Sequence, residues 1–126
     1  MKDLKLSIEI SRELASSVLG LNVVYTESCE HRDGIIGIWT DINTKPIEEI
    51  SIYEFAFKCK EWAISKGYII KSKPYDYNED TTFSGGYFWI TRIEDGHCPN
   101  CGANRSEVQA IIDGCEWILR KNNKSL

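Results

Sequence analysis

The stretch YEFAFKCKEWAISKGYIIKSK, residues 53–73, decides the fold that we expect for this chain of 126 residues. Its first part predicts an amphipathic helix, because four apolar side chains recur at helical spacing and form one stripe: Phe55, Cys59, Trp62 and Ala63. Gly67 follows as a helix stop, and residues 68–73 then have the length and apolar character of a strand. The stretch therefore predicts a helix that passes directly into a strand.

Both ends of this helix–strand unit have recognisable boundary residues. Ser51 and Glu54 form a capping box, in which each side chain can accept a hydrogen bond from the backbone N–H of the other at the helix start. Pro74 has no N–H to donate to a neighbouring strand, so we expect the strand to close there. The unit thus begins at Ser51 and ends before Pro74.

The sequence on either side supplies five further elements. Apolar spacing predicts a helix over residues 7–19. Residues 22–26 and 35–41 are β-rich runs joined by a polar loop, which predicts a hairpin. Residues 86–93 place aromatic side chains on both faces of a strand, so we expect this strand in the middle of a sheet and covered on both sides. A second capping box over residues 106–109 predicts the last helix.

The resulting order, α-β-β-α-β-β-α, predicts an α+β fold. We expect a single domain over residues 1–126, with about three helices packed on a four-stranded sheet. The sheet should be mostly antiparallel, because short hairpins exclude purely parallel crossovers. Residues 121–126 are expected to form a frayed C-terminal tail.

Four stretches give the chain a resemblance to a known group of proteins. ELASSVLGLN (13–22), the opening stretch 53–73, GGYFWITRI (85–93) and SEVQAIIDGCEWIL (106–119) together resemble small phage or prophage proteins of the ABA-sandwich type. The resemblance implies a thin sheet between helices and a phage or prophage origin. It implies no known activity and transfers no functional residue. The chain departs from that group in the Cys-Pro-Asn-Cys segment before its last helix.

Composition and charge narrow the classes of function. The net charge of −4 and the pI of about 5.2 argue against broad nucleic-acid affinity, which depends on clustered lysine and arginine. No apolar run reaches the roughly 18 residues of a membrane span, so no membrane association is expected. Residues 1–14 lack the pattern of an export signal, so we expect a reducing, cytoplasmic location. Five cysteines in that compartment do not indicate a disulfide framework.

The segment GHCPNCGA, residues 96–103, has the form of a zinc knuckle. A turn of this kind presents two thiolates to one metal ion. A structural zinc ion needs four protein ligands, and the loop between the first two strands offers a cysteine and a histidine as the second pair. The predicted structural zinc site consists of Cys98, Cys101, Cys29 and His31.

Other interpretations of the cysteine segment stay open. His97 competes with His31 as a ligand, although a residue next to Cys98 seldom reaches the same metal comfortably. Cys98 and Cys101 can also be free thiols in a surface turn. A thiol-disulfide redox function of this pair needs a position at a helix N-terminus, whereas the better helix cap is Ser106, a turn or more later. Redox chemistry is therefore the less favoured alternative.

The remaining cysteines, Cys59 and Cys115, lie on apolar helical stripes. We expect both to be buried as small hydrophobic side chains. No motif supplies an orienting group or an oxyanion hole for a cysteine nucleophile, so no catalytic residue is assigned.

Aromatic side chains crowd the last two predicted strands and their connecting loop. If Tyr75, Tyr77 and Phe83 are exposed, they form a patch of the kind that anchors protein partners. With Lys71, Lys73 and Arg92 nearby, the alternative is a stacking platform for single-stranded nucleic acid, but the acidic balance favours a protein partner. The sequence thus predicts a non-catalytic accessory or interaction module with a structural zinc site. A thiol-disulfide protein and a single-stranded nucleic-acid binder are the alternatives.

Overall fold

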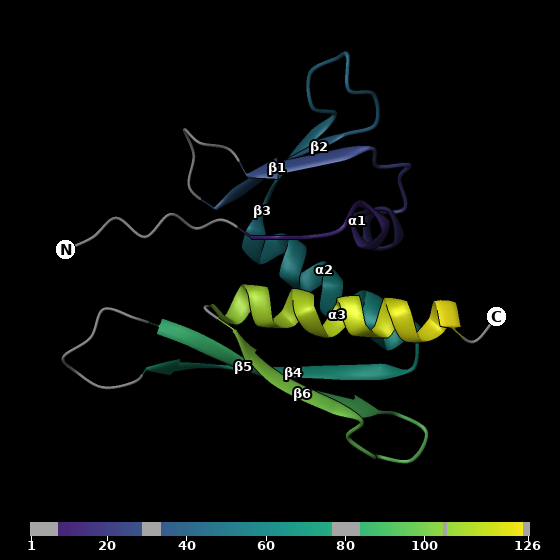
Figure 1. The fold of residues 1–126 in the computed structure, drawn as a ribbon, viewed down its shortest axis with the longest axis vertical. Coiled ribbons are helices and arrows are strands. Elements are labelled where there is room, and N and C mark those ends of the chain that lie inside the picture. Colours follow the sequence, from purple (N-terminus) through teal and green to yellow (C-terminus); the bar gives the residue numbers. More distant parts are fainter. Residues whose placement is uncertain (1–7, 29–33, 77–83, 105, 125–126) are drawn as a thin grey trace.

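The computed structural model describes residues 8–28, 34–76, 84–104 and 106–124. Within these ranges the chain forms three helices and six strands (Figure 1). In chain order they are α1 (Arg12–Leu19), β1 (Tyr25–Ser28), β2 (Ile35–Trp39), β3 (Glu48–Ser51), α2 (Ile52–Ser65), β4 (Tyr68–Asp76), β5 (Ser84–Arg92), β6 (Asn100–Asn104) and α3 (Glu107–Lys124). The predicted α+β class and its three helices are confirmed. α3 includes residues 121–124, which belong to the segment expected as a tail.

The strands form two antiparallel sheets of three strands each. Sheet A has the order β1-β2-β3, and sheet B has the order β4-β5-β6. The expected single four-stranded sheet is therefore wrong. Sequence patterns miss β3 and β6 because both are short, with one apolar residue in EEIS and only small or polar residues in NCGAN. Pairing with a neighbouring strand, which local propensity does not report, holds these two segments extended.

The expected helix–strand unit is present as α2 and β4. Ser51 caps α2 by accepting a 3.1 Å hydrogen bond from the backbone N–H of Tyr53. Pro74 does not close the strand, because β4 continues to Asp76 and Pro74 pairs with Gly86 of β5. β4 is an edge strand of sheet B, and an edge strand tolerates proline where the missing N–H faces away from the partner strand.

The helices lie between the two sheets (Figure 1). α3 packs along sheet B, α2 contacts both α3 and β3, and α1 packs against α2 and β1. Each sheet therefore buries its inner face against helices and turns its outer face away from them. The expected central position of β5 is confirmed, whereas the expected cover on both of its faces is wrong, because the helices lie on one side only.

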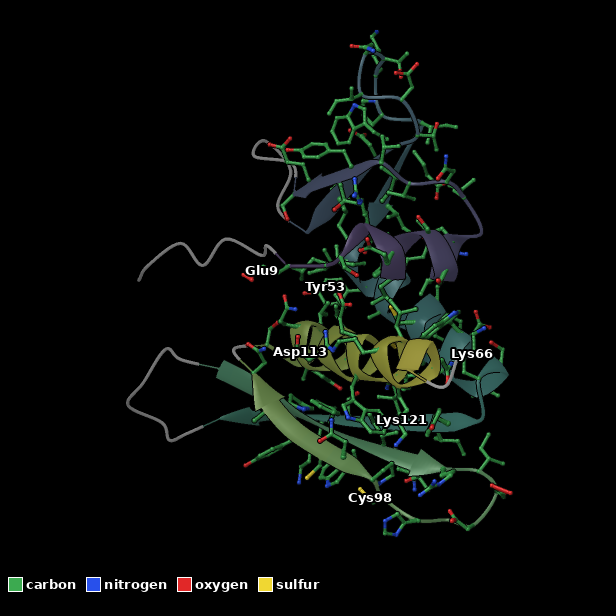
Figure 2. The ribbon with its side chains drawn as sticks, turned by 45° about the vertical axis from the view of Figure 1, so that its right-hand side comes forward. Glu9, Tyr53, Lys66, Cys98, Asp113 and Lys121 are labelled. Atoms are coloured by element: carbon green, nitrogen blue, oxygen red, sulfur yellow. The ribbon has the colours of Figure 1, made fainter. Side chains whose placement is uncertain are left out.

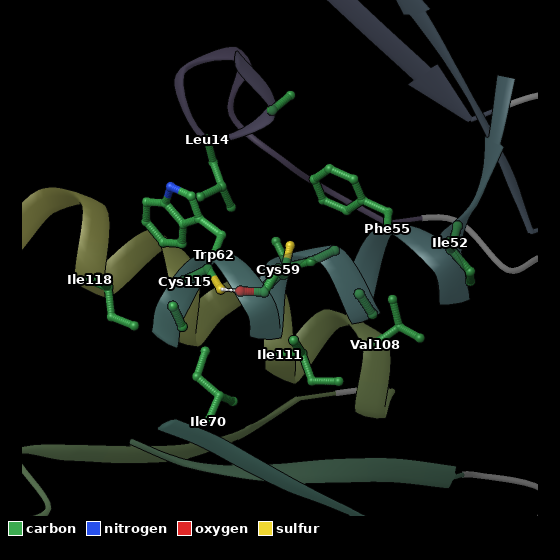
Figure 3. Close-up of a cluster of buried hydrophobic side chains, with 14 of the residues drawn as sticks. Leu14, Ile52, Phe55, Cys59, Trp62, Ile70, Val108, Ile111, Cys115 and Ile118 are labelled. Atoms are coloured by element: carbon green, nitrogen blue, oxygen red, sulfur yellow. Dashed lines mark hydrogen bonds between the residues drawn. The ribbon is translucent and has the colours of Figure 1, made fainter. Parts of the chain in front are cut away.

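Buried side chains of α2 and α3 pack against each other in the hydrophobic core (Figure 3). Cys59 and Cys115 are fully buried there, as predicted, and the Sγ–H of Cys115 donates a 3.4 Å hydrogen bond to the carbonyl oxygen of Cys59. Its side-chain contact with Cys115, together with burial, raises the pKa of the Cys59 thiol far above its usual range. The Cys59 thiol therefore stays protonated, and both cysteines act as small apolar core side chains.

Three close contacts fix β5 against its neighbours. A Cβ atom at Gly86 would lie 2.3 Å from the Cα atom of Glu107 at the start of α3, so only glycine fits there. The buried ring of Phe88 lies between Gly102 and Gly114, where added Cβ atoms would approach it to 2.9 and 3.1 Å. Because Phe88 points inward, the residues on either side of it in β5 point outward.

Candidate functional site

The outer face of sheet B exposes two aromatic rings. Tyr87 and Trp89 are 37% and 39% exposed, while Phe88 and Ile90 are buried. This is the alternation of a strand with one covered face. The rings of Tyr87 and Trp89 lie side by side, with centroids 6.0 Å apart and planes inclined by 34°. They form one continuous aromatic surface.

The strands on either side of β5 determine what surrounds these rings. Trp89 is the register partner of Lys71 on β4 and of Cys101 on β6. Tyr87 likewise pairs with Lys73 on β4 and with an alanine on β6. All of these neighbours are exposed. Lysine side chains therefore line one edge of the aromatic surface, and small side chains leave the other edge open.

The charge of this outer face differs from that of the whole chain. In the part of sheet B that the structure describes, the outward-facing residues include no acidic side chain: Ile69, Lys71, Lys73, Tyr87, Trp89, Thr91, Cys101 and Ala103. Residues 1–51 contain five lysines and arginines against nine acidic residues, so they account for the entire net charge of −4. Sheet B thus presents a basic, aromatic surface in an acidic protein.

The two cysteines of the predicted zinc knuckle lie at sheet B. Cys101 belongs to β6 and Cys98 to the loop before it, and both are exposed. Cys98 Sγ lies 3.5 Å from the carbonyl oxygen of Asn100, and Figure 2 shows Cys98 beside sheet B, away from the helices. Since α3 begins only at Glu107, neither thiol lies at the helix N-terminus that the thiol-disulfide alternative requires.

The other half of the predicted zinc site, Cys29 and His31, lies outside the described residues. The residues that flank it, Ser28 and Gly34, lie at sheet A, across the helix layer from β6 (Figure 1). Among the residues that the structure describes, no group of three or more His, Cys, Asp or Glu side chains is placed to hold a metal ion. The four-ligand zinc site stays a prediction.

His97, the competing ligand, lies in a tight loop between β5 and β6. Its backbone N–H donates a 3.0 Å hydrogen bond to Asp95 Oδ1, and its carbonyl oxygen accepts a 2.8 Å bond from the backbone N–H of Arg92. The bond from the His97 backbone lowers the pKa of the Asp95 carboxyl group, to which the nearby Arg92 charge also contributes. These hydrogen bonds fix the loop that leads into β6.

The aromatic patch that we expect in the hairpin loop is not the pair of exposed rings on β5. Tyr77 and Phe83 lie outside the described residues, and Tyr75 lies in β4 opposite Gly85. The signal for the exposed rings is the alternation within residues 86–93. Aromatics on both faces of that strand suggest two covered faces, but one face stays open because the helices occupy the other side of sheet B.

No protein family, curated protein or solved structure matches this chain. The resemblance to small phage and prophage proteins of the ABA-sandwich type stays a prediction. The thin sheet between helices that it implies is not what the structure has, because here the helices lie between two sheets (Figure 1). Within the described part of the chain, no helix combines the length and the apolar character needed to cross a membrane.

A polar groove where the N-terminal segment meets α3 has no signature in the sequence. Gln109, almost fully buried, donates from Nε2 to the carbonyl oxygen of Glu9 at 2.9 Å and accepts at Oε1 from its N–H at 2.7 Å. Glu116 accepts hydrogen bonds from the N–H and the hydroxyl of Ser11 at 2.8 and 2.9 Å. Ser106 caps α3 by accepting from the Gln109 N–H, whereas the Gln109 side chain bonds the N-terminal segment. The groove therefore fastens this segment to α3.

Proposed function

We propose that the protein binds single-stranded nucleic acid on the outer face of sheet B. The exposed pair of rings, Tyr87 and Trp89, supports this proposal most directly, because every base has a flat face that can stack on an aromatic side chain. Such stacking contributes about 1–3 kcal/mol per base and depends little on the base. Two neighbouring rings on one strand suit about two successive bases.

The lysines of β4 supply charge that matches such a ligand. Lys71 and Lys73 are exposed and are register partners of the two rings. Residues two positions apart on an antiparallel strand lie about 6.8 Å apart on the same face, so both side chains line one edge of the aromatic surface. A phosphate backbone along β4 would meet both lysines while its bases lie over β5. The small side chains of β6 leave room for the bases.

The distribution of charge favours a nucleic acid over the protein partner that the net charge alone favours. The excess of acidic residues belongs to residues 1–51, which include all of sheet A. The helix layer separates the described carboxylates of sheet A from sheet B (Figure 1), and charges more than about 8 Å apart are largely screened at physiological salt. Local charge, which is positive on the outer face of sheet B, then dominates the encounter with phosphate groups.

Fluorescence anisotropy of a labelled oligothymidylate of about 15 nucleotides tests this function. We expect saturable binding that weakens as the salt concentration rises from about 50 to about 200 mM, because binding to phosphates releases counterions. Trp89→Ala should weaken the affinity about 10- to 100-fold, since one stacked base is lost. The matched control is Trp39→Ala, which removes a tryptophan from sheet A and should leave the affinity unchanged.

Three results contradict the proposed function. The first is the absence of any anisotropy change with the unmodified protein at about 50 mM salt. The second is a Trp89→Ala protein that is folded by circular dichroism and binds as tightly as the unmodified protein. The third is a preference for the same sequence in double-stranded form, because paired and stacked bases cannot lie on the two rings.

A further inference from the structure

The outer face of sheet A has an aromatic pair like that of sheet B, but acidic neighbours. Tyr25 on β1 and Trp39 on β2 are register partners, and their ring centroids lie 5.1 Å apart. In the adjacent row of the same face, Gly37 on β2 pairs with Glu27 on β1 and with Glu49 on β3. Both glutamates are exposed. This row therefore places one carboxylate on each side of a glycine.

The ring of Trp39 covers that glycine. A Cβ atom at Gly37 would lie 2.9 and 3.0 Å from the ring atoms Cζ3 and Cη2 of Trp39. The indole N–H donates a 3.1 Å hydrogen bond to the carbonyl oxygen of Thr44, and the Tyr25 hydroxyl donates a 3.0 Å bond to Glu27 Oε1. The Trp39 indole therefore lies over Gly37, in the row of the sheet that holds the two glutamates.

We infer that this cradle, formed by Trp39, Tyr25, Glu27 and Glu49, binds an arginine side chain of a protein partner. A guanidinium group is planar, stacks on aromatic faces and forms paired hydrogen bonds with carboxylates, so it uses both features of the cradle. A lysine ammonium group is a more strongly hydrated point charge and matches the flat indole less well. The two carboxylates repel phosphate, which disfavours nucleic acid on this face.

The cradle is independent of the proposed nucleic-acid surface. Sheets A and B lie on opposite sides of the helix layer, so the two outer faces point away from each other and can be occupied at the same time (Figure 1). A second copy of this chain is the competing occupant, because the outer face of sheet B presents Lys71 and Lys73. An NMR titration with an arginine peptide separates the two occupants.

Chemical-shift mapping by NMR with the capped peptide Gly-Arg-Gly-Arg-Gly tests the cradle. We expect saturable shifts of the Trp39 indole N–H and of the Gly37 and Glu27 amides, with binding about fivefold tighter than for the Gly-Lys-Gly-Lys-Gly peptide. Glu27→Gln combined with Glu49→Gln should weaken arginine-peptide binding at least about tenfold. The charge-matched control, Glu13→Gln combined with Glu61→Gln, changes two exposed carboxylates outside the cradle and should leave peptide binding unchanged.

Each other outcome overturns the assignment. Shifts confined to other surfaces, equal affinity for a Gly-Gln-Gly-Gln-Gly peptide, or unchanged binding by a folded Glu27→Gln, Glu49→Gln protein would each exclude an arginine-binding cradle. Line broadening that grows with protein concentration without peptide, and that disappears in the Lys71→Gln, Lys73→Gln protein, would instead assign the cradle to a second copy of the chain.

Discussion

Sheets A and B are built alike and differ in their outer faces. Each follows a helix, passes through three antiparallel strands and leads into a serine-capped helix, so α2 ends the first unit and begins the second. On sheet A, Trp39 lies over a glycine between two glutamates, whereas on sheet B, Trp89 lies beside Tyr87 between a lysine and a cysteine. Topology therefore does not determine the chemistry of an exposed sheet face. The residues in register with each tryptophan do.

The largest expected effect compares one glycine from each sheet. Gly86→Ala should lower the free energy of unfolding by about 3 kcal/mol or more, because its Cβ atom would meet the backbone of Glu107 at 2.3 Å. At Gly37 the nearest atoms to an added Cβ atom belong to the side chains of Trp39 and Pro46 and none to the backbone, so we expect Gly37→Ala to cost less than about 1.5 kcal/mol. Urea denaturation followed by circular dichroism measures both values. Equal losses would show that sheets A and B do not differ in this way.

A structural zinc ion would connect the sheet A unit to the sheet B unit, because its predicted ligands come from segments of both: Cys98, Cys101, Cys29 and His31. If the site forms, a chelator should lower Tm by more than about 10 °C, since a structural zinc ion contributes directly to the free energy of folding. Cys101→Ser should give a similar loss, and elemental analysis should find one zinc per chain. A zinc-free protein whose Tm the chelator does not change would exclude the site.

The lysines of sheet B should determine how binding depends on salt. Two phosphate contacts to a single strand give a slope of about −1.4 in a plot of log affinity against log salt concentration. Lys71→Gln combined with Lys73→Gln should make this slope less negative by about 1.4 and should weaken oligonucleotide binding. The charge-matched control, Arg12→Gln combined with Lys45→Gln, changes two exposed residues outside sheet B and should keep the slope. An unchanged slope in the sheet B variant would place the phosphate contacts elsewhere.

The smallest expected effect is the pH dependence of sheet A. The hydrogen bond between Tyr25 and Glu27 raises the pKa of the Tyr25 phenol above its usual value of 10.0. With a raised pKa in the folded state, this interaction stabilises the fold below pH 10.0, and the contribution is lost as the pH rises through the folded-state pKa. Glu27→Gln should move the Tyr25 titration, followed by NMR of labelled tyrosine, back toward 10.0. A titration that does not move would exclude Glu27 as the cause.

Local sequence patterns predict the elements whose apolar residues recur regularly. The stripe of Phe55, Cys59 and Trp62 predicts α2, and the two-residue alternation in residues 86–93 predicts β5. β3 and β6 have almost no such signal, because Ile50 is the only large apolar residue in the two strands. Their extended conformation comes from pairing with β2 and β5, which is a tertiary property.

The candidate surface is predictable only in part. The sequence places Lys71 and Lys73 beside a stacking platform, but the face of β5 that stays open depends on where the helices pack, which no single strand reports. Gln109 has the spacing of a local helix cap, yet its side chain bonds Glu9, 100 positions earlier in the chain. Contacts of this kind arise from the meeting of distant segments and leave no local pattern.

The position of α2 limits how this protein can evolve. One side of the helix packs with α1 and β3, and the other packs with α3 and β4, so it completes both halves of the interior. A gene fragment that encodes only one sheet with its helices would therefore leave an apolar surface of α2 exposed to water. We therefore expect the sheet A and sheet B units to be duplicated, lost or transferred only together. The exposed residues of each outer face can still change by point substitution.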